Sequence, residues 1–86
     1  MKKGERKMTA KEMFEELGYE QTTNNTILIE YRDDEGSNYV YIIFDLLFTG
    51  YEVGYFDGDD GITRTIKTSI KEHEAITQQM KELGWI

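Results

Sequence analysis

The chain has 86 residues, no cysteine and a formal net charge of −7. Without cysteine, neither a disulfide framework nor a thiolate metal site can form. No apolar run approaches the roughly 18 residues that a transmembrane helix needs, and the basic N-terminus lacks the apolar segment of a signal peptide. We therefore expect one small domain in a reducing, cytoplasmic compartment, with no membrane contact.

The charge is divided unevenly between a short basic arm and an acidic body. Residues 1–7 carry a net charge of +3, which leaves −10 on residues 8–86. An acidic body repels phosphate backbones and so disfavours nonspecific nucleic-acid binding. We expect residues 1–7 to be a disordered arm or leader before Met8, in preference to a binding arm, and residues 8–86 to form a single α+β domain.

A first helix is predicted over residues 8–18. Thr9 and Glu12 have the spacing of a capping box, and Gly18 can adopt the left-handed conformation that ends a helix. Residues 20–25 are polar and are expected to be a connection. Apolar residues at helical spacing predict one buried stripe, made of Ala10, Met13, Phe14 and Leu17.

Four strands are predicted next, from β-branched and aromatic residues between turn signals. Gly54 lies in the middle of the third strand, where it indicates a bulge or a close approach of another group. The acidic loops 33–38 and 57–61 follow odd-numbered strands and are expected at the same end of the sheet. The strands cover residues 26–32, 38–45, 51–57 and 62–67.

A second helix follows Ser69, which forms a capping box with Glu72. Gly84 ends it, so that both helices finish in the same way, with ELGY at 16–19 and ELGW at 82–85. We interpret this as repeated C-capping, because no matching strands surround the two phrases. The predicted apolar stripe consists of Ile70, His73, Ile76, Thr77, Met80 and Leu83.

The order α-β-β-β-β-α predicts an α+β fold with two layers. In it, a four-stranded antiparallel meander carries the N- and C-terminal helices on one face. The predicted core joins the two helix stripes to Ile27, Ile29, Tyr31, Val40, Ile42, Phe44 and Val53. Two modest stripes suffice for one sheet face of a domain this size, so the other face of the central strand is expected to stay uncovered.

Four stretches of the chain resemble a group of small uncharacterised proteins encoded by phages and prophages of low-GC Gram-positive bacteria. They are MTAKEMFEELGYE at 8–20, NNTILIEY at 24–31, IIFDL at 42–46 and QMKELGWI at 79–86. The resemblance implies a bacterial or phage intracellular setting and suggests Met8 as an original start. Its motifs are caps and core positions, so it implies no activity and no site residues.

The aromatic residues of the strands are the main candidates for function. Tyrosines are good strand formers that tolerate one wet face, which alone would explain them. They are also enriched at protein interfaces, and single-strand nucleic-acid binders stack bases on them. The candidate interaction face comprises Tyr39, Tyr41, Ile43, Tyr51 and Tyr55.

Other candidates are weaker. His73 is the one histidine, and without a second ligand or base beside it, it is expected to be structural. Asp57, Asp59 and Asp60 crowd one turn but lack the distal glutamate of a calcium loop, so we expect a solvated turn. The apolar turn 46–48 either closes the end of the core or forms a contact tip.

No nucleophile–base pair, metal cluster, phosphate loop or cofactor motif is evident. The sequence therefore favours a non-enzymatic accessory protein that binds another protein, or a second copy of itself, through an aromatic sheet face. The alternative is single-stranded nucleic-acid binding through Tyr39, Tyr41, Tyr51 and Tyr55. An enzyme is the third hypothesis.

Overall fold

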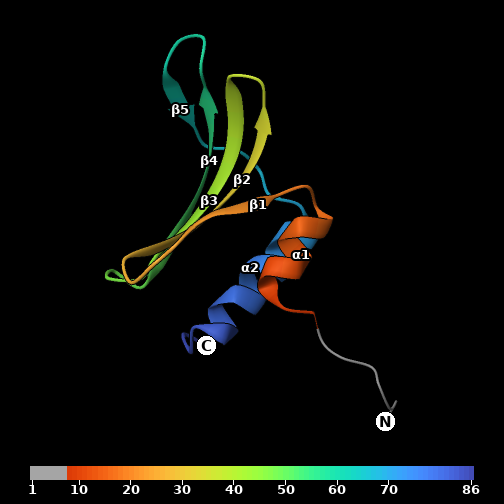
Figure 1. The fold of residues 1–86 in the computed structure, drawn as a ribbon, viewed down its shortest axis with the longest axis vertical. Coiled ribbons are helices and arrows are strands. Elements are labelled where there is room, and N and C mark those ends of the chain that lie inside the picture. Colours follow the sequence, from red (N-terminus) through yellow and green to blue (C-terminus); the bar gives the residue numbers. More distant parts are fainter. Residues whose placement is uncertain (1–7) are drawn as a thin grey trace.

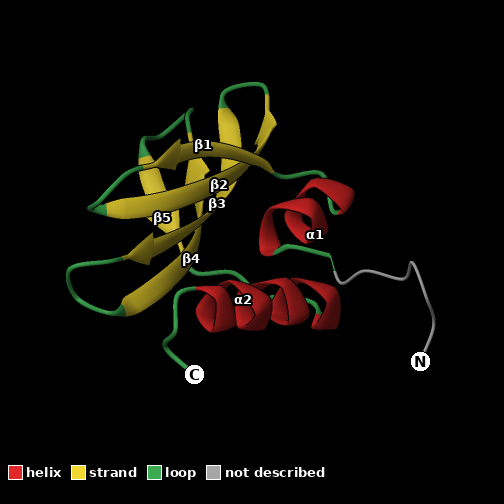
Figure 2. Ribbon diagram, turned by 60° about the horizontal axis from the view of Figure 1, so that its bottom comes forward, coloured by secondary structure: helices red, strands yellow, loops and turns green. Residues whose placement is uncertain are grey.

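The computed structural model describes residues 8–86, so the prediction for residues 1–7 lies outside the described part. The fold is α+β with two layers: a five-stranded antiparallel sheet in the order β1-β2-β3-β4-β5 and two helices against one of its faces (Figures 1 and 2). The elements are α1 (Ala10–Glu16), β1 (Glu20–Asn24), β2 (Leu28–Glu35), β3 (Asn38–Asp45), β4 (Gly50–Asp57), β5 (Ile62–Arg64) and α2 (Ile70–Glu82).

The predicted four-stranded sheet is wrong by one strand, because β1 occupies the stretch expected to be a polar connection. β1 pairs with β2, with an irregularity between Gln21 and Thr23. Gln21 is half-buried, and its amide Nε2 donates to the hydroxyl of Tyr31 at 3.1 Å. Because Gln21 hydrogen-bonds a buried hydroxyl, this inward-facing position of β1 is polar. The alternation of apolar and polar residues that usually indicates a strand is therefore missing here.

Two strand ends also differ from the prediction. β2 continues to Glu35, and the turn to β3 consists of residues 36 and 37, with Gly36 at φ 66°. Asp33 and Asp34 thus lie in the sheet, opposite Val40 and Tyr39, although acidic residues are poor strand formers. β5 ends at Arg64, because the chain then leaves the sheet edge toward α2.

The helix caps are confirmed at both ends. Thr9 and Ser69 each accept a hydrogen bond from the backbone N–H of the glutamate three residues on. The carboxylate of that glutamate accepts the N–H of the cap residue in return, which completes both capping boxes. At the C-terminal ends, Gly18 has φ 97° and Gly84 has φ 78°. The repeated phrase ELG followed by an aromatic is therefore a shared way of ending a helix.

The buried face of α2 is rotated relative to the predicted stripe. Ile70 is 75% exposed, and His73 is exposed as well. The prediction is confirmed for Ile76, which is buried, and for Met80 and Leu83, which pack against the core. Ala75 and Gln79 are also buried, although the predicted stripe omitted them. Gln79 is drawn inward because its Oε1 accepts a hydrogen bond of 2.6 Å from the hydroxyl of Tyr31, and the small Ala75 permits close packing.

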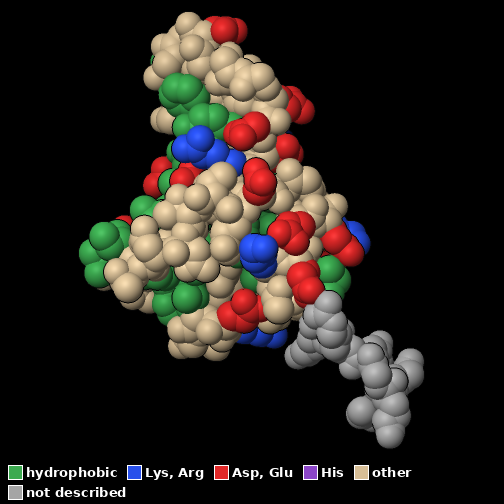
Figure 3. Space-filling model, in the orientation of Figure 1, with side chains coloured by type: hydrophobic (Ala, Val, Ile, Leu, Met, Phe, Trp, Pro, Cys, Tyr) green, Lys and Arg blue, Asp and Glu red, His purple; other side chains and the backbone are tan. Residues whose placement is uncertain are grey.

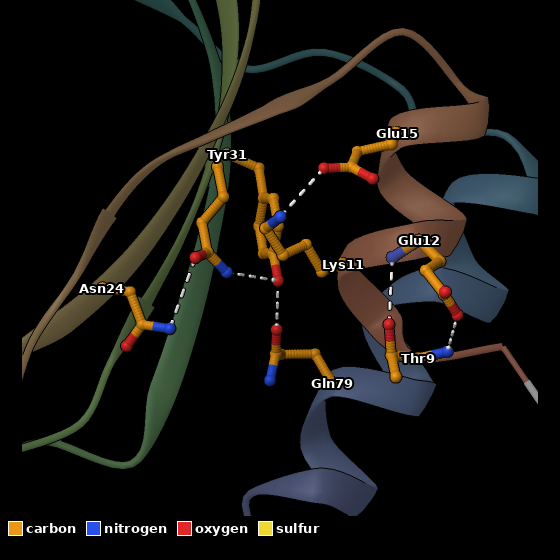
Figure 4. A network of polar contacts seen from close by, with 8 residues as sticks. Thr9, Lys11, Glu12, Glu15, Asn24, Tyr31 and Gln79 are labelled. Carbon is orange, nitrogen blue, oxygen red and sulfur yellow. Dashed lines mark hydrogen bonds and ion pairs between the residues drawn. The ribbon is translucent and has the colours of Figure 1, made fainter.

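Tyr31 is the centre of the core. Its ring stacks on Phe14 at 4.1 Å between centroids, and its hydroxyl lies between Gln79 and Gln21 (Figure 4). Asn24 extends this network by donating to Gln21. The network ties α2 to β1 and β2 through the interior, so that the edge strand and the helix layer are held together.

Most of the predicted sheet core is confirmed. The prediction that Ile27 belongs to the core is wrong, because Ile27 lies before β2 and is 51% exposed. The remaining predicted sheet residues are buried or pack against the buried cluster: Ile29, Tyr31, Val40, Ile42, Phe44 and Val53. Neither helix within residues 8–86 is long and apolar enough to cross a membrane.

Candidate protein-interaction surface

The sheet face opposite the helices carries a row of aromatic and apolar side chains. Side chains alternate between faces along a strand, so Tyr39, Tyr41 and Ile43 of β3 point away from the core residues Ile42 and Phe44. Register adds their neighbours, since Arg32 of β2 lies opposite Tyr41 and Phe56 of β4 lies opposite Tyr39. We call the set Arg32, Tyr39, Tyr41, Ile43 and Phe56 the outer face; both helices lie on the other side of the sheet (Figure 2).

Side chains of the outer face contact one another across three strands. The Arg32 guanidinium carbon lies 4.1 Å from the centroid of the Tyr39 ring, and Tyr39 stacks on Phe56 at 5.1 Å. Tyr41 meets Tyr39 edge to face at 6.2 Å. Nε of Arg32 also donates to Glu30 at 2.9 Å. These contacts hold large side chains in fixed positions before any partner arrives, which lowers the entropy cost of binding.

Tyr41 is the most buried member of the outer face, with 8% of its surface exposed. Its ring lies across Gly54, where an added Cβ would overlap the phenol, and its hydroxyl donates to Oε2 of Glu52 at 3.0 Å. Burial, and then this hydrogen bond, raise the pKa of Tyr41. The predicted close approach at Gly54 is confirmed, and the register of β3 with β4 runs through it without a bulge.

The structure divides the five predicted interface residues between the two sheet faces. Tyr39, Tyr41 and Ile43 share the outer face, whereas Tyr51 and Tyr55 lie on the helix-covered side. Directly opposed residues of an antiparallel pair share a face, and Tyr51 is opposite the core residue Phe44, with ring centroids 5.8 Å apart. Grouping the five as one face was therefore wrong.

Arg32 and Phe56 belong to the outer face, although the predicted set omitted them. The turn between Asp45 and Gly50 fixes the register, and counting outward from it pairs Tyr39 with Phe56. The predicted strand ends, at residues 45 and 51, instead give a register shifted by one residue, which would place Tyr55 opposite Tyr41 and exchange the two faces of β4.

The apolar turn between β3 and β4 closes the end of the core with one residue and exposes the next two. Leu46 packs against the core, while Leu47 is 76% exposed and Phe48 is 81% exposed. The carboxylate of Asp45 accepts the backbone N–H groups of Leu47 and Phe48 at 3.0 and 2.9 Å, and Thr49 has φ 62°. A shallow hollow of about 210 Å³ lies beside it, lined by Ile43, Asp45, Phe48, Gly50, Tyr51 and Glu52.

The acidic turns lie at one end of the sheet, as predicted (Figure 1). The backbone N–H of Gly58 donates to Oδ1 of Asn38 at 2.9 Å, which ties the second turn to β3. Arg64 pairs with Asp60 at 2.7 Å and with Asp57 at 3.6 Å. Among residues 8–86, no group of three or more histidine or acidic side chains is placed to hold a metal ion.

Acidic side chains are spread over the visible face in Figure 3, from the turns of the sheet down to the helices.

Comparison of the chain with models of protein families, with curated proteins and with solved structures gives no match. The surface is therefore interpreted from its own chemistry: fixed aromatic rings, an apolar centre at Ile43, and carboxylates on both sides.

Proposed function

We propose that this protein is a non-enzymatic module that binds another protein through the outer face of its sheet. The supporting observation is that the helices pack on the opposite side of the sheet (Figure 2), while Tyr39, Ile43 and Phe56 on the other side are partly exposed. Large aromatic groups that are already fixed in place are typical of interface hot spots, and contiguous apolar surface is a liability without a partner.

The partner is expected to present a basic surface with an apolar centre. Ile43 lies between Glu30 of β2 and Glu52 of β4, and residues 8–86 carry a net charge of −10. Complementary charge speeds association and selects partners, so the DNA-binding surface of a host protein is one suitable class. A second copy carries the same negative charge, which favours a different protein over a homodimer.

The biological setting is part of the proposal. The stretches that resemble phage and prophage proteins support an accessory protein of that origin, acting in the cytoplasm of a bacterial host. The lack of cysteine is consistent with a reducing compartment.

Single-stranded nucleic-acid binding is less well supported, because the cation of the outer face, Arg32, is already paired. That mode needs cations free to track phosphates beside the stacking rings. Arg32 is already paired with Glu30 and placed over Tyr39, and Arg64 is paired with Asp60. Tyr41 hydrogen-bonds a carboxylate, so the rings stand in an acidic setting.

The test compares three immobilised proteins in lysate of the producing cells: wild type, Ile43→Lys and Ile70→Lys. The last is the matched control, because it is the same substitution at a residue that is 75% exposed on α2. We expect wild type and Ile70→Lys to retain the same discrete protein and Ile43→Lys to lose it. Equal retention by all three, or quenching of tyrosine fluorescence by a single-stranded oligonucleotide at low salt, would contradict the proposal.

A further inference from the structure

The edge of β4 that faces away from β3 is only partly paired. β5 pairs with residues 55–57 of β4 and then ends (Figure 1). Within the part of the chain that the structure describes, no strand pairs with the same edge at residues 50–54. An open strand edge presents a row of backbone donors and acceptors that another chain can use.

The direction of the free groups follows from the neighbouring turn. The N–H of Gly61 donates to the backbone oxygen of Asp57 at 2.7 Å, so the peptide groups of Asp57 face the β5 side. Peptide direction repeats at every second residue of an antiparallel strand. The N–H and C=O groups of Val53 and Tyr51 therefore also point away from β3, toward the place where β5 is missing.

Glu52 decides what can pair there. In the register that joins residues 50–54 to the same residues of a second copy, Glu52 stands opposite its own counterpart. Because it lies between two outward-facing residues, this pair is of the close kind, with Cα atoms about 4.5 Å apart. Like charges directly opposite destabilise a strand pair, so self-pairing in this register is opposed, whereas a cation at the same point would form a pair.

We propose that the free edge of β4 accepts an extended segment of another protein by strand addition, with a lysine or arginine of that segment opposite Glu52. Backbone hydrogen bonds to Tyr51 and Val53 would supply the attachment, and the cation would supply the selectivity. Residues flanking the cation would meet the side chains of Tyr51 and Val53 and are expected to be β-branched or apolar. Glu52 borders both this edge and the outer face. The two proposals can still fail separately, because Val53→Pro alters only the edge and Ile43→Lys alters only the outer face.

The experiment uses the Glu52→Lys variant as the probe, because its β4 is a strand of matching length that carries the required cation. Sedimentation equilibrium should show wild type and variant each as monomers, and their equimolar mixture at low salt as a heterodimer that dissociates in high salt. Wild type mixed with Asp59→Lys is the matched control, since the charge change is the same and Asp59 is exposed in a turn. A mixture with Glu52→Lys that stays monomeric, or equal association with Asp59→Lys, would overturn the proposal.

Two further measurements separate strand addition from simple charge attraction. Val53→Pro in both components should abolish the heterodimer, because it removes an outward N–H and leaves the bonds to β3 intact. In wild-type monomer, amide hydrogen exchange at Tyr51 and Val53 should be faster than at Glu52 and Gly54 by about tenfold or more. Equal protection of all four amides, or a heterodimer that survives Val53→Pro, would show that this edge is not the binding surface.

Discussion

The phenol ring of Tyr41 lies across Gly54 on the neighbouring strand, in the space where a side chain would otherwise begin. The contact covers a glycine that would expose backbone in mid-strand, and it turns the Tyr41 hydroxyl toward Glu52. This pair of residues thus links the outer face to the carboxylate at the β4 edge.

Gly54→Ala should destabilise the protein, because the new methyl group would overlap the Tyr41 ring at Oη and Cζ. We expect a loss of about 1–3 kcal/mol in the free energy of unfolding, measured with urea. The same substitution in a Tyr41→Ala background should cost less, because the obstacle is gone. Equal costs in the two backgrounds would show that the loss does not come from this contact.

Tyr31→Phe should also destabilise the fold. The Tyr31 residue is 1% exposed, and removing its hydroxyl deprives Gln79 and Gln21 of their shared partner. We expect a cost of about 1–3 kcal/mol in urea unfolding. Tyr55→Phe is the control, because the Tyr55 hydroxyl makes no hydrogen bond within residues 8–86, and its cost should stay below about 0.5 kcal/mol. If both variants unfold alike, the buried network contributes nothing specific.

Stability should fall at high pH through Tyr19. Burial, and then the 2.6 Å hydrogen bond from its hydroxyl to Glu72, raise the pKa of Tyr19 in the folded state. An unfolded tyrosine loses its proton near pH 10, whereas Tyr19 in the folded state keeps its proton to a higher pH. The contribution of Tyr19 to the free energy of unfolding is therefore complete below about pH 10. It is lost as the pH rises from there toward the folded-state pKa.

Tyr19→Phe is the variant that isolates this effect. Above about pH 10 the unfolding free energy of wild type should fall more steeply than that of Tyr19→Phe, by up to about 1.4 kcal/mol per pH unit. Urea unfolding between about pH 8 and pH 11 measures the difference. Parallel profiles for the two proteins would mean that Tyr19 does not titrate differently in the folded state.

Local signals in the sequence predicted a large part of this fold. Thr9, Ser69, Gly18 and Gly84 were placed correctly because each needs a specific residue type at one position of a helix end. The central strand β3 was placed correctly because it is apolar on both faces. These signals depend only on residues close together in the chain.

The errors arise where distant residues decide the structure. β1 is a strand because Gln21 meets the buried hydroxyl of Tyr31, and α2 turns Gln79 inward for the same reason. The spacing of apolar residues along the sequence does not predict such polar contacts. The division of Tyr51 from Tyr41 likewise depends on the register between β3 and β4, which each strand taken alone does not contain.

The most direct test of the outer face is photo-crosslinking in the producing cells. A benzophenone side chain replaces Ile43 in one variant and the exposed Ile70 in another. The proposal predicts one discrete protein adduct from position 43, competed away by excess wild type, and none from position 70. No adduct from position 43, or the same adducts from both positions, would contradict binding through this face.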